Sequence, residues 1–170
     1  EIRFGAESNG EMYVRLDNYG VSAGGSEPNN WDPIINITAN EWAHISFTKS
    51  GNLITLYLNG VYNGDITWGD DAASASASPY NWYLGWNEFE APDDYYDGKM
   101  DDFMVWDYAL NASEIQASMS FPLSGDEDGL VGYWNFNEGS GDVVYDQSGN
   151  GNDVSINGGA DYSTDTPEFL

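Results

Sequence analysis

Three apolar runs separated by very short turn signals constrain the fold of this chain more than any other feature. The runs cover residues 42–49, 53–58 and 61–68, with Ser50-Gly51-Asn52 between the first two and Asn59-Gly60 between the last two. An Asn-Gly pair between alternating segments is typical of a tight β-hairpin turn. The spacing therefore predicts an antiparallel β-meander over residues 42–68.

Further short strands are predicted along the whole chain. Residues 18–33 have the composition of a loop, and a single helix begins at Asn111, where Glu114 has the spacing of a capping box, and runs to about Met119. Many short strands with one short helix predict an all-β antiparallel sandwich or barrel. The other predicted strands cover residues 1–7, 11–17, 80–86, 98–108 and 130–136, with short extended pieces at 143–145 and 154–156.

Composition excludes several classes of function. With 29 Asp and Glu against 4 Lys and Arg, the net charge is −25, which argues against nucleic acid or an anionic membrane and favours cations. No apolar run approaches the roughly 18 residues of a membrane span. The chain has no cysteine and one histidine, His44, so it has no disulfides, no thiolate nucleophile and no multi-histidine metal site. An aromatic content of 15% indicates a folded domain rather than an acidic tail.

Three ordered motifs resemble those of a known family. Trp42-Ala43-His44 followed by residues 56–61 is similar to the hairpin of laminin G-like jelly rolls. Residues 98–106, Gly-Lys-Met-Asp-Asp-Phe-Met-Val-Trp, resemble a late strand of that family, and residues 109–115 resemble the helix that follows it. The resemblance, which extends to pentraxins, implies a concanavalin A-like (lectin/glucanase) antiparallel β-sandwich jelly roll with one short helix.

The same resemblance suggests a domain organisation. Residues 1–122 correspond to a sandwich that lacks its first strands, and we expect the chain to be a piece of a longer protein. Residues 123–170 resemble the opening of such a domain. We expect this segment to complete the same sandwich, because Trp134 and Phe136 need apolar partners. The alternative is that it begins a following repeat.

Calcium is the cofactor that the residues favour, because Ca²⁺ takes carboxylate and carbonyl oxygens from irregular loops. In related folds the first Asp of the Asp-Asp strand binds a cation, which points to Asp101, and the turn at 146–150 offers Asp146 and Asn150. Pentraxins carry calcium ligands in the loop after their Leu-Gly pair, which points to Glu88. The alternatives are that Asp101 and its neighbour satisfy backbone amides, and that residues 87–97 form a solvated acidic loop.

Aromatic side chains in loops provide a candidate carbohydrate site, because such rings stack on sugar C–H faces and neighbouring carboxylates bind hydroxyls. The alternative is a hydrophobic plug at the end of the sandwich. The candidate ligand-binding residues all belong to the loop after Leu84-Gly85: Trp86, Asn87, Glu90, Tyr95 and Tyr96.

Catalysis is not expected. Glucanases of this fold carry their paired carboxylates in an E-x-D-x-x-E strand, and no such run occurs here. The sequence thus predicts a non-catalytic, calcium-dependent module that binds carbohydrate or glycoprotein, within a secreted or cell-surface protein of bacterial type. The alternative is a structural or adhesive repeat of an extracellular adhesin or filament, which pairs with neighbouring repeats and uses calcium only structurally.

Overall fold

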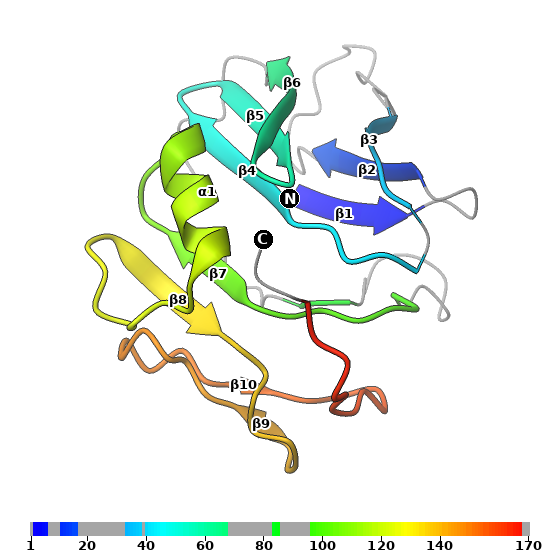
Figure 1. The fold of residues 1–170 in the computed structure, drawn as a ribbon, viewed down its shortest axis with the longest axis vertical. Coiled ribbons are helices and arrows are strands. Elements are labelled where there is room, and N and C mark those ends of the chain that lie inside the picture. Colours follow the sequence, from blue (N-terminus) through cyan, green and yellow to red (C-terminus); the bar gives the residue numbers. More distant parts are fainter. Residues whose placement is uncertain are drawn as a thin grey trace, which may run out of the picture. The chain divides into compact units, whose positions relative to one another are not determined.

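A computed structural model of the chain describes residues 2–6, 11–16, 33–38, 40–67, 83–85 and 96–167 (Figure 1). The chain divides into two compact units, Glu1–Asp97 and Gly98–Leu170, which are considered separately. All strand pairs in the described residues are antiparallel, and they accompany one short helix. The predicted all-β antiparallel class is thereby confirmed.

The first unit contains the predicted meander. The central strand buries Ile54 and Leu56 completely, so the apolar alternation of the sequence faces a core. Asn59 and Gly60 both have positive φ, at 50° and 71°, as a tight hairpin turn requires. The sheet order is β4-β5-β6, with the bounds β4 Ile45–Ser50, β5 Leu53–Leu58 and β6 Val61–Thr67.

A second three-stranded sheet in this unit has the order β1-β2-β3. The predicted hairpin at the start of the chain is present as β1 (Ile2–Ala6) and β2 (Glu11–Leu16). The third strand, β3 (Pro33–Asn36), was not predicted, because its first residue is a proline at the end of a Pro- and Asn-rich stretch. Proline is tolerated there, since the first residue of a strand can do without its N–H.

The second unit pairs β7 (Phe103–Trp106) with β8 (Leu130–Trp134) and the short β9 (Val143–Val144) with β10 (Val154–Ser155). A strand over residues 98–108 was predicted, but β7 is much shorter. It starts only after Asp102, whose φ of 49° lies in the left-handed region and cannot continue a strand.

The helix α1 (Ala112–Ser120) begins as the sequence predicts. The Asn111 side chain accepts hydrogen bonds from the N–H groups of Ser113 and Glu114, at 2.9 and 3.1 Å. The Glu114 carboxylate accepts the N–H of Asn111 at 2.7 Å, which completes the capping box. The helix has nine residues, and no helix among the described residues is long and apolar enough to cross a membrane.

In the second unit, this helix, β8 and β9 supply the buried apolar side chains: Ile115, Leu130, Tyr133, Trp134 and Val144. Trp134 packs against Phe103 with ring centroids 5.7 Å apart, and its indole N–H donates to the Asn152 carbonyl at 2.9 Å. Trp134 is therefore a core residue, as predicted. The strand predicted over 80–86 is absent from residues 83–85, the part of it that the structure describes.

Candidate functional site

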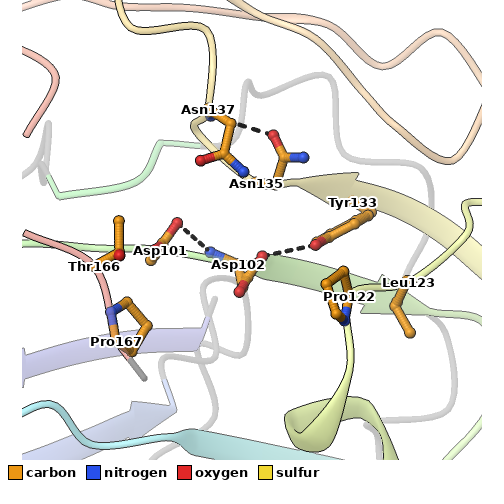
Figure 2. Close-up of a pocket in the computed structure, with 9 residues that line it drawn as sticks. All are labelled: Asp101, Asp102, Pro122, Leu123, Tyr133, Asn135, Asn137, Thr166 and Pro167. Atoms are coloured by element: carbon orange, nitrogen blue, oxygen red, sulfur yellow. Dashed lines mark hydrogen bonds between the residues drawn. The ribbon is translucent and has the colours of Figure 1, made fainter. Parts of the chain in front are cut away.

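A pocket of about 160 Å³ with mixed polar and apolar lining lies within the second unit, beside the start of β7 and the end of β8 (Figure 2). Its walls come from segments that are distant in sequence but adjacent in the fold: the approach to β7, the chain after α1, β8 with its extension, and the C-terminal segment. The residues that line it are Asp101, Asp102, Pro122, Leu123, Tyr133, Asn135, Asn137, Thr166 and Pro167.

Two adjacent carboxylates are fixed at this pocket by a chain of hydrogen bonds (Figure 2). The Tyr133 hydroxyl donates to Oδ1 of Asp102 at 2.7 Å, and the Asp102 N–H donates to Oδ1 of Asp101 at 3.1 Å. The second oxygen of each carboxylate accepts no hydrogen bond from the described residues. Each can therefore accept one from a ligand.

The surroundings of Asp101 disfavour the charged form of its carboxylate. Partial burial raises the pKa of Asp101, the neighbouring Asp102 carboxylate raises it further, and the hydrogen bond from the Asp102 N–H acts in the opposite direction. Burial also raises the pKa of Tyr133 well above its ordinary value, as does its hydrogen bond to Asp102. Tyr133 consequently stays a neutral donor, and the pocket carries uncompensated negative charge.

The remaining lining combines amides with apolar surface. Oδ1 of Asn135 accepts the Asn137 N–H at 3.2 Å, and the Asn137 side-chain amide makes no hydrogen bond within the described part of the chain. Pro122, Leu123 and Pro167 contribute apolar wall. The pocket thus offers hydrogen-bond acceptors, amide donors and apolar contact to a small ligand.

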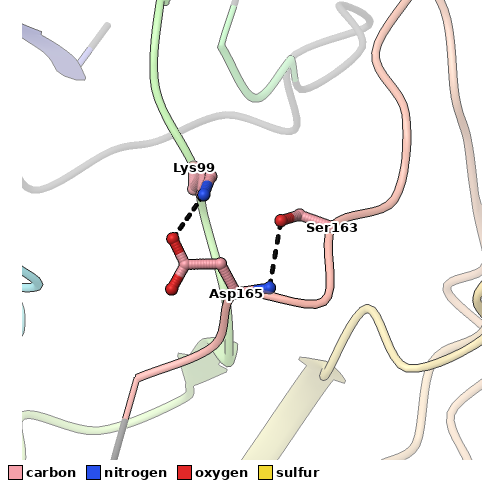
Figure 3. Close-up of polar contacts among 3 residues, drawn as sticks. All are labelled: Lys99, Ser163 and Asp165. Atoms are coloured by element: carbon pink, nitrogen blue, oxygen red, sulfur yellow. Dashed lines mark hydrogen bonds and ion pairs between the residues drawn. The ribbon is translucent and has the colours of Figure 1, made fainter.

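No basic side chain lines the pocket. Lys99, the single Lys or Arg in residues 98–170, makes an ion pair with Asp165, whose N–H donates to Oγ of Ser163 at 3.1 Å (Figure 3). This ion pair joins the approach to β7 to the C-terminal segment, immediately before Thr166 and Pro167. It therefore helps to position one wall of the pocket without neutralising its carboxylates.

The calcium ligands predicted in this unit lie in two places. Asp101 lines the pocket, whereas Asp146 and Asn150 belong to the loop that follows β9. The buried Asp146 carboxylate accepts three backbone N–H groups at 2.9 to 3.0 Å, from Tyr133, Ser148 and Asn152. Burial alone would raise the pKa of Asp146, but hydrogen bonds from these residues outweigh it and lower the pKa to about 2.

Asn150 is also engaged by the protein. Its side-chain amide donates to the carbonyls of Leu130 at 3.0 Å and Val131 at 3.1 Å, on the strand edge of β8. The residues that the structure describes contain no group of three or more His, Asp or Glu suited to hold a metal ion. Glu88 lies outside the described residues, so calcium binding stays a prediction.

The predicted carbohydrate-binding loop is described only at its ends. Trp86, Asn87, Glu90 and Tyr95 lie outside the described residues. The Tyr96 N–H donates to the Gly85 carbonyl at 2.8 Å, so the two ends of the loop meet, and the Tyr96 side chain is 42% exposed.

Sequence reasoning did not single out Tyr133, Asn135, Asn137 or Thr166 as site residues. The sequence shows only that Asn135 and Asn137 follow directly after β8, where Phe136, with a φ of 51°, interrupts the extended backbone. It does not show that these residues lie beside the two aspartates before β7.

Antiparallel sheets of short strands with a single short helix define an all-β domain of the sandwich class. The chain belongs to the concanavalin A-like lectin/glucanases superfamily, whose family model matches residues 1–116. The predicted resemblance to laminin G-like domains is therefore confirmed.

Two solved structures are similar to this chain. The first is a Bacteroides ovatus protein to which carbohydrate binding is provisionally assigned, with a TM-score of 0.54 and 19% identity over 72% of this chain and 36% of that one. At this identity the likeness shows the fold alone. The second is an S-layer domain-containing protein from Clostridium thermocellum, with a TM-score of 0.42 and 26% identity over 68% of this chain and 54% of that one.

The chain thus spans about a third and about half of these two proteins. No curated protein sequence matches it.

Proposed function

We propose that this chain is a non-catalytic module that binds carbohydrate or glycoprotein and belongs to a larger secreted or cell-surface protein. The observation that carries the proposal is membership of a superfamily of lectins and glucanases over residues 1–116. Retaining glycosidases need two carboxylates about 5–5.5 Å apart. The sequence lacks the E-x-D-x-x-E run of the glucanases of this fold, which favours binding without hydrolysis.

The loop from Trp86 to Tyr96 is the proposed contact with the sugar. It combines aromatic rings that can stack on a sugar with Asn87 and Glu90, whose side chains can bind hydroxyls. The hydrogen bond between Tyr96 and Gly85 supports this role, because it closes the loop at its base. The carbohydrate binding assigned to the Bacteroides ovatus protein of similar fold agrees with the proposal.

Glycan-array binding of the intact chain tests this function. We expect binding to a defined set of glycans that is lost in Trp86→Ala and retained in Tyr145→Ala, which removes a 55% exposed aromatic ring from the other unit. Release of reducing sugar from a bound glycan would contradict the proposal. Concentration-dependent assembly of a chain that binds no glycan would favour the structural or adhesive repeat instead.

Calcium dependence is the second part of the proposal. The strong negative charge supports it, as does the supply of oxygen donors at Asp101, Asp146, Asn150 and Glu88. A ligand that binds only the native state at 100 times its Kd adds about 2.7 kcal/mol of stability. We therefore expect calcium to raise the unfolding temperature by several degrees relative to EDTA, and magnesium at the same concentration to do so much less. Equal unfolding temperatures in calcium and EDTA would contradict this part.

A further inference from the structure

We propose that the pocket beside β7 and β8 binds one sugar residue that carries a protonated amine. The inference rests on the carbohydrate-binding function proposed above and names the class of sugar. In this proposal the carboxylate of Asp101 binds an amine, whereas the calcium proposal above assigns the same residue to a metal ion. Glu88 and residues 146–150 remain candidate calcium ligands.

The size of the pocket suits a single sugar unit. About 10–15 Å³ of such a cavity suffices for one water molecule, so about 160 Å³ leaves room for a ligand the size of a sugar unit. The pocket is open to solvent at Asn137, whose side chain is exposed, so the rest of a glycan can continue outwards.

The lining matches the two faces of a sugar ring. Pro122, Leu123 and Pro167 offer apolar surface to C–H groups, and the amides of Asn135 and Asn137 can both donate to and accept from hydroxyls (Figure 2). Figure 2 shows the two aspartates, linked by their hydrogen bond, among these side chains.

The negative charge of the pocket favours a sugar with a protonated amine over a neutral or acidic sugar. Asp101 and Asp102 present their unused oxygens, and no basic side chain lines the pocket because Lys99 pairs with Asp165. An ammonium group donates three hydrogen bonds and is attracted by both carboxylates. A sugar acid would add a third negative charge and be repelled.

A calcium ion fits this pocket less well. Calcium takes six to eight oxygen ligands, among them carboxylate and Asn carbonyl oxygens. In this pocket Oδ1 of Asp101, Asp102 and Asn135 each already accepts a hydrogen bond from the protein, and much of the remaining lining is apolar. The described residues hold no group of three acidic or histidine side chains for a metal. An amine needs only the acceptors that are present.

Calorimetric titration of the full chain with four simple sugars tests the proposal, at a pH where the amine is protonated. We expect glucosamine to bind more tightly than glucose or N-acetylglucosamine, and glucuronic acid to bind least. Asp101→Asn and Asp102→Asn should each weaken glucosamine about tenfold, as loss of a charge-assisted hydrogen bond implies. Both variants should fold, because asparagine keeps the acceptor oxygen and tolerates the left-handed backbone of residue 102.

The control variant is Asp128→Asn, which removes the same charge from an exposed residue of the same unit outside the pocket and should leave glucosamine affinity unchanged. Equal affinity for N-acetylglucosamine and glucosamine would overturn the proposal. The proposal would also be overturned if the chain bound no glucosamine but bound calcium, and if Asp102→Asn abolished that calcium binding. Glycan binding on the array that is indifferent to both pocket variants would overturn the pocket assignment and leave the proposed function standing.

Discussion

The Tyr133 hydroxyl donates a 2.7 Å hydrogen bond to the carboxylate of Asp102, a residue 31 positions earlier in the chain. Tyr133 is 3% exposed and belongs to the core of the second unit, whereas Asp102 lines the pocket. Asp102 also has a φ of 49°, which a residue other than glycine adopts at some energetic cost. The bond therefore ties a strained pocket residue to the rigid core, and it fixes where the carboxylate lies.

Tyr133→Phe tests this tie. The substitution keeps the buried ring and removes a hydroxyl that donates to a carboxylate, so we expect the free energy of unfolding to fall by about 1.5 to 3 kcal/mol. Denaturant unfolding measures the change. Tyr145→Phe is the matched control: its ring is 55% exposed and its hydroxyl makes no hydrogen bond with the described residues, so its effect should stay within about 0.5 kcal/mol. Similar losses in both variants would contradict the role given to the Tyr133 bond.

Asp146 should make stability depend on acid pH. Its carboxylate accepts N–H groups from β8 and from its own loop, which lowers its pKa to about 2. Because the pKa is lower in the folded chain than in the unfolded chain, the stabilisation is complete above about pH 4, the ordinary value of an aspartate, and is lost as the pH falls towards 2. Asp146→Asn should cost about 2 to 4 kcal/mol at neutral pH.

The measurement is the free energy of unfolding of the original chain and of Asp146→Asn as a function of pH. The difference between them should shrink as the pH falls from about 4 to 2. The many other carboxylates titrate in both proteins, so their contribution cancels in this difference. A difference that stays constant over this range would show that the charge of Asp146 does not act through these bonds.

Gly125 and Gly149 form a matched pair for testing how closely the chain packs against the loop that follows β9. Both have positive φ, at 92° and 76°, so alanine strains the backbone at either position. A Cβ at Gly125 would also overlap the backbone carbonyl of Gln147, whereas one at Gly149 meets nothing within 4 Å. We expect Gly125→Ala to destabilise the chain by at least about 2 kcal/mol more than Gly149→Ala, measured by denaturant unfolding. Equal losses would mean that only backbone strain matters.

Local signals in the sequence predicted the fold well where the interactions are themselves local. The capping box at Asn111 and the Asn59-Gly60 hairpin involve residues within a few positions of one another, so their chemistry is visible in a short window. The shortening of β7 was not predictable in this way. The sequence around Asp102 predicts extended backbone. The left-handed conformation of this residue is stabilised by the hydrogen bond from Tyr133, which is distant in sequence.

The candidate site shows the same limit. Asp101 could be singled out because its run resembles the Asp-Asp strand of related folds, in which the first aspartate binds a cation, and it does line the pocket. Its partners Asn135, Asn137 and Thr166 reach it through the pairing of β7 with β8 and through the Lys99–Asp165 ion pair, both of which join residues far apart in the chain. A single sequence does not reveal such pairings, so the composition of the pocket follows only from the fold.

Asn150 covers the free edge of β8 and provides the last test. Its amide donates to the carbonyls of Leu130 and Val131, and the Asn152 amide donates to Val131 at 2.9 Å. Within the described residues, β8 pairs with β7 alone, and these side chains cap carbonyls that this pairing leaves open. Asn150→Asp replaces this donor with a carboxylate facing two carbonyl oxygens, and the free energy of unfolding should fall by about 1 to 3 kcal/mol. Asn157→Asp, the same change at an exposed residue whose amide contacts one carbonyl, should cost less. Because an uncapped edge can pair with another chain, Asn150→Asp should also self-associate more in sedimentation experiments, and a monomeric variant of unchanged stability would show that the edge is protected by other means.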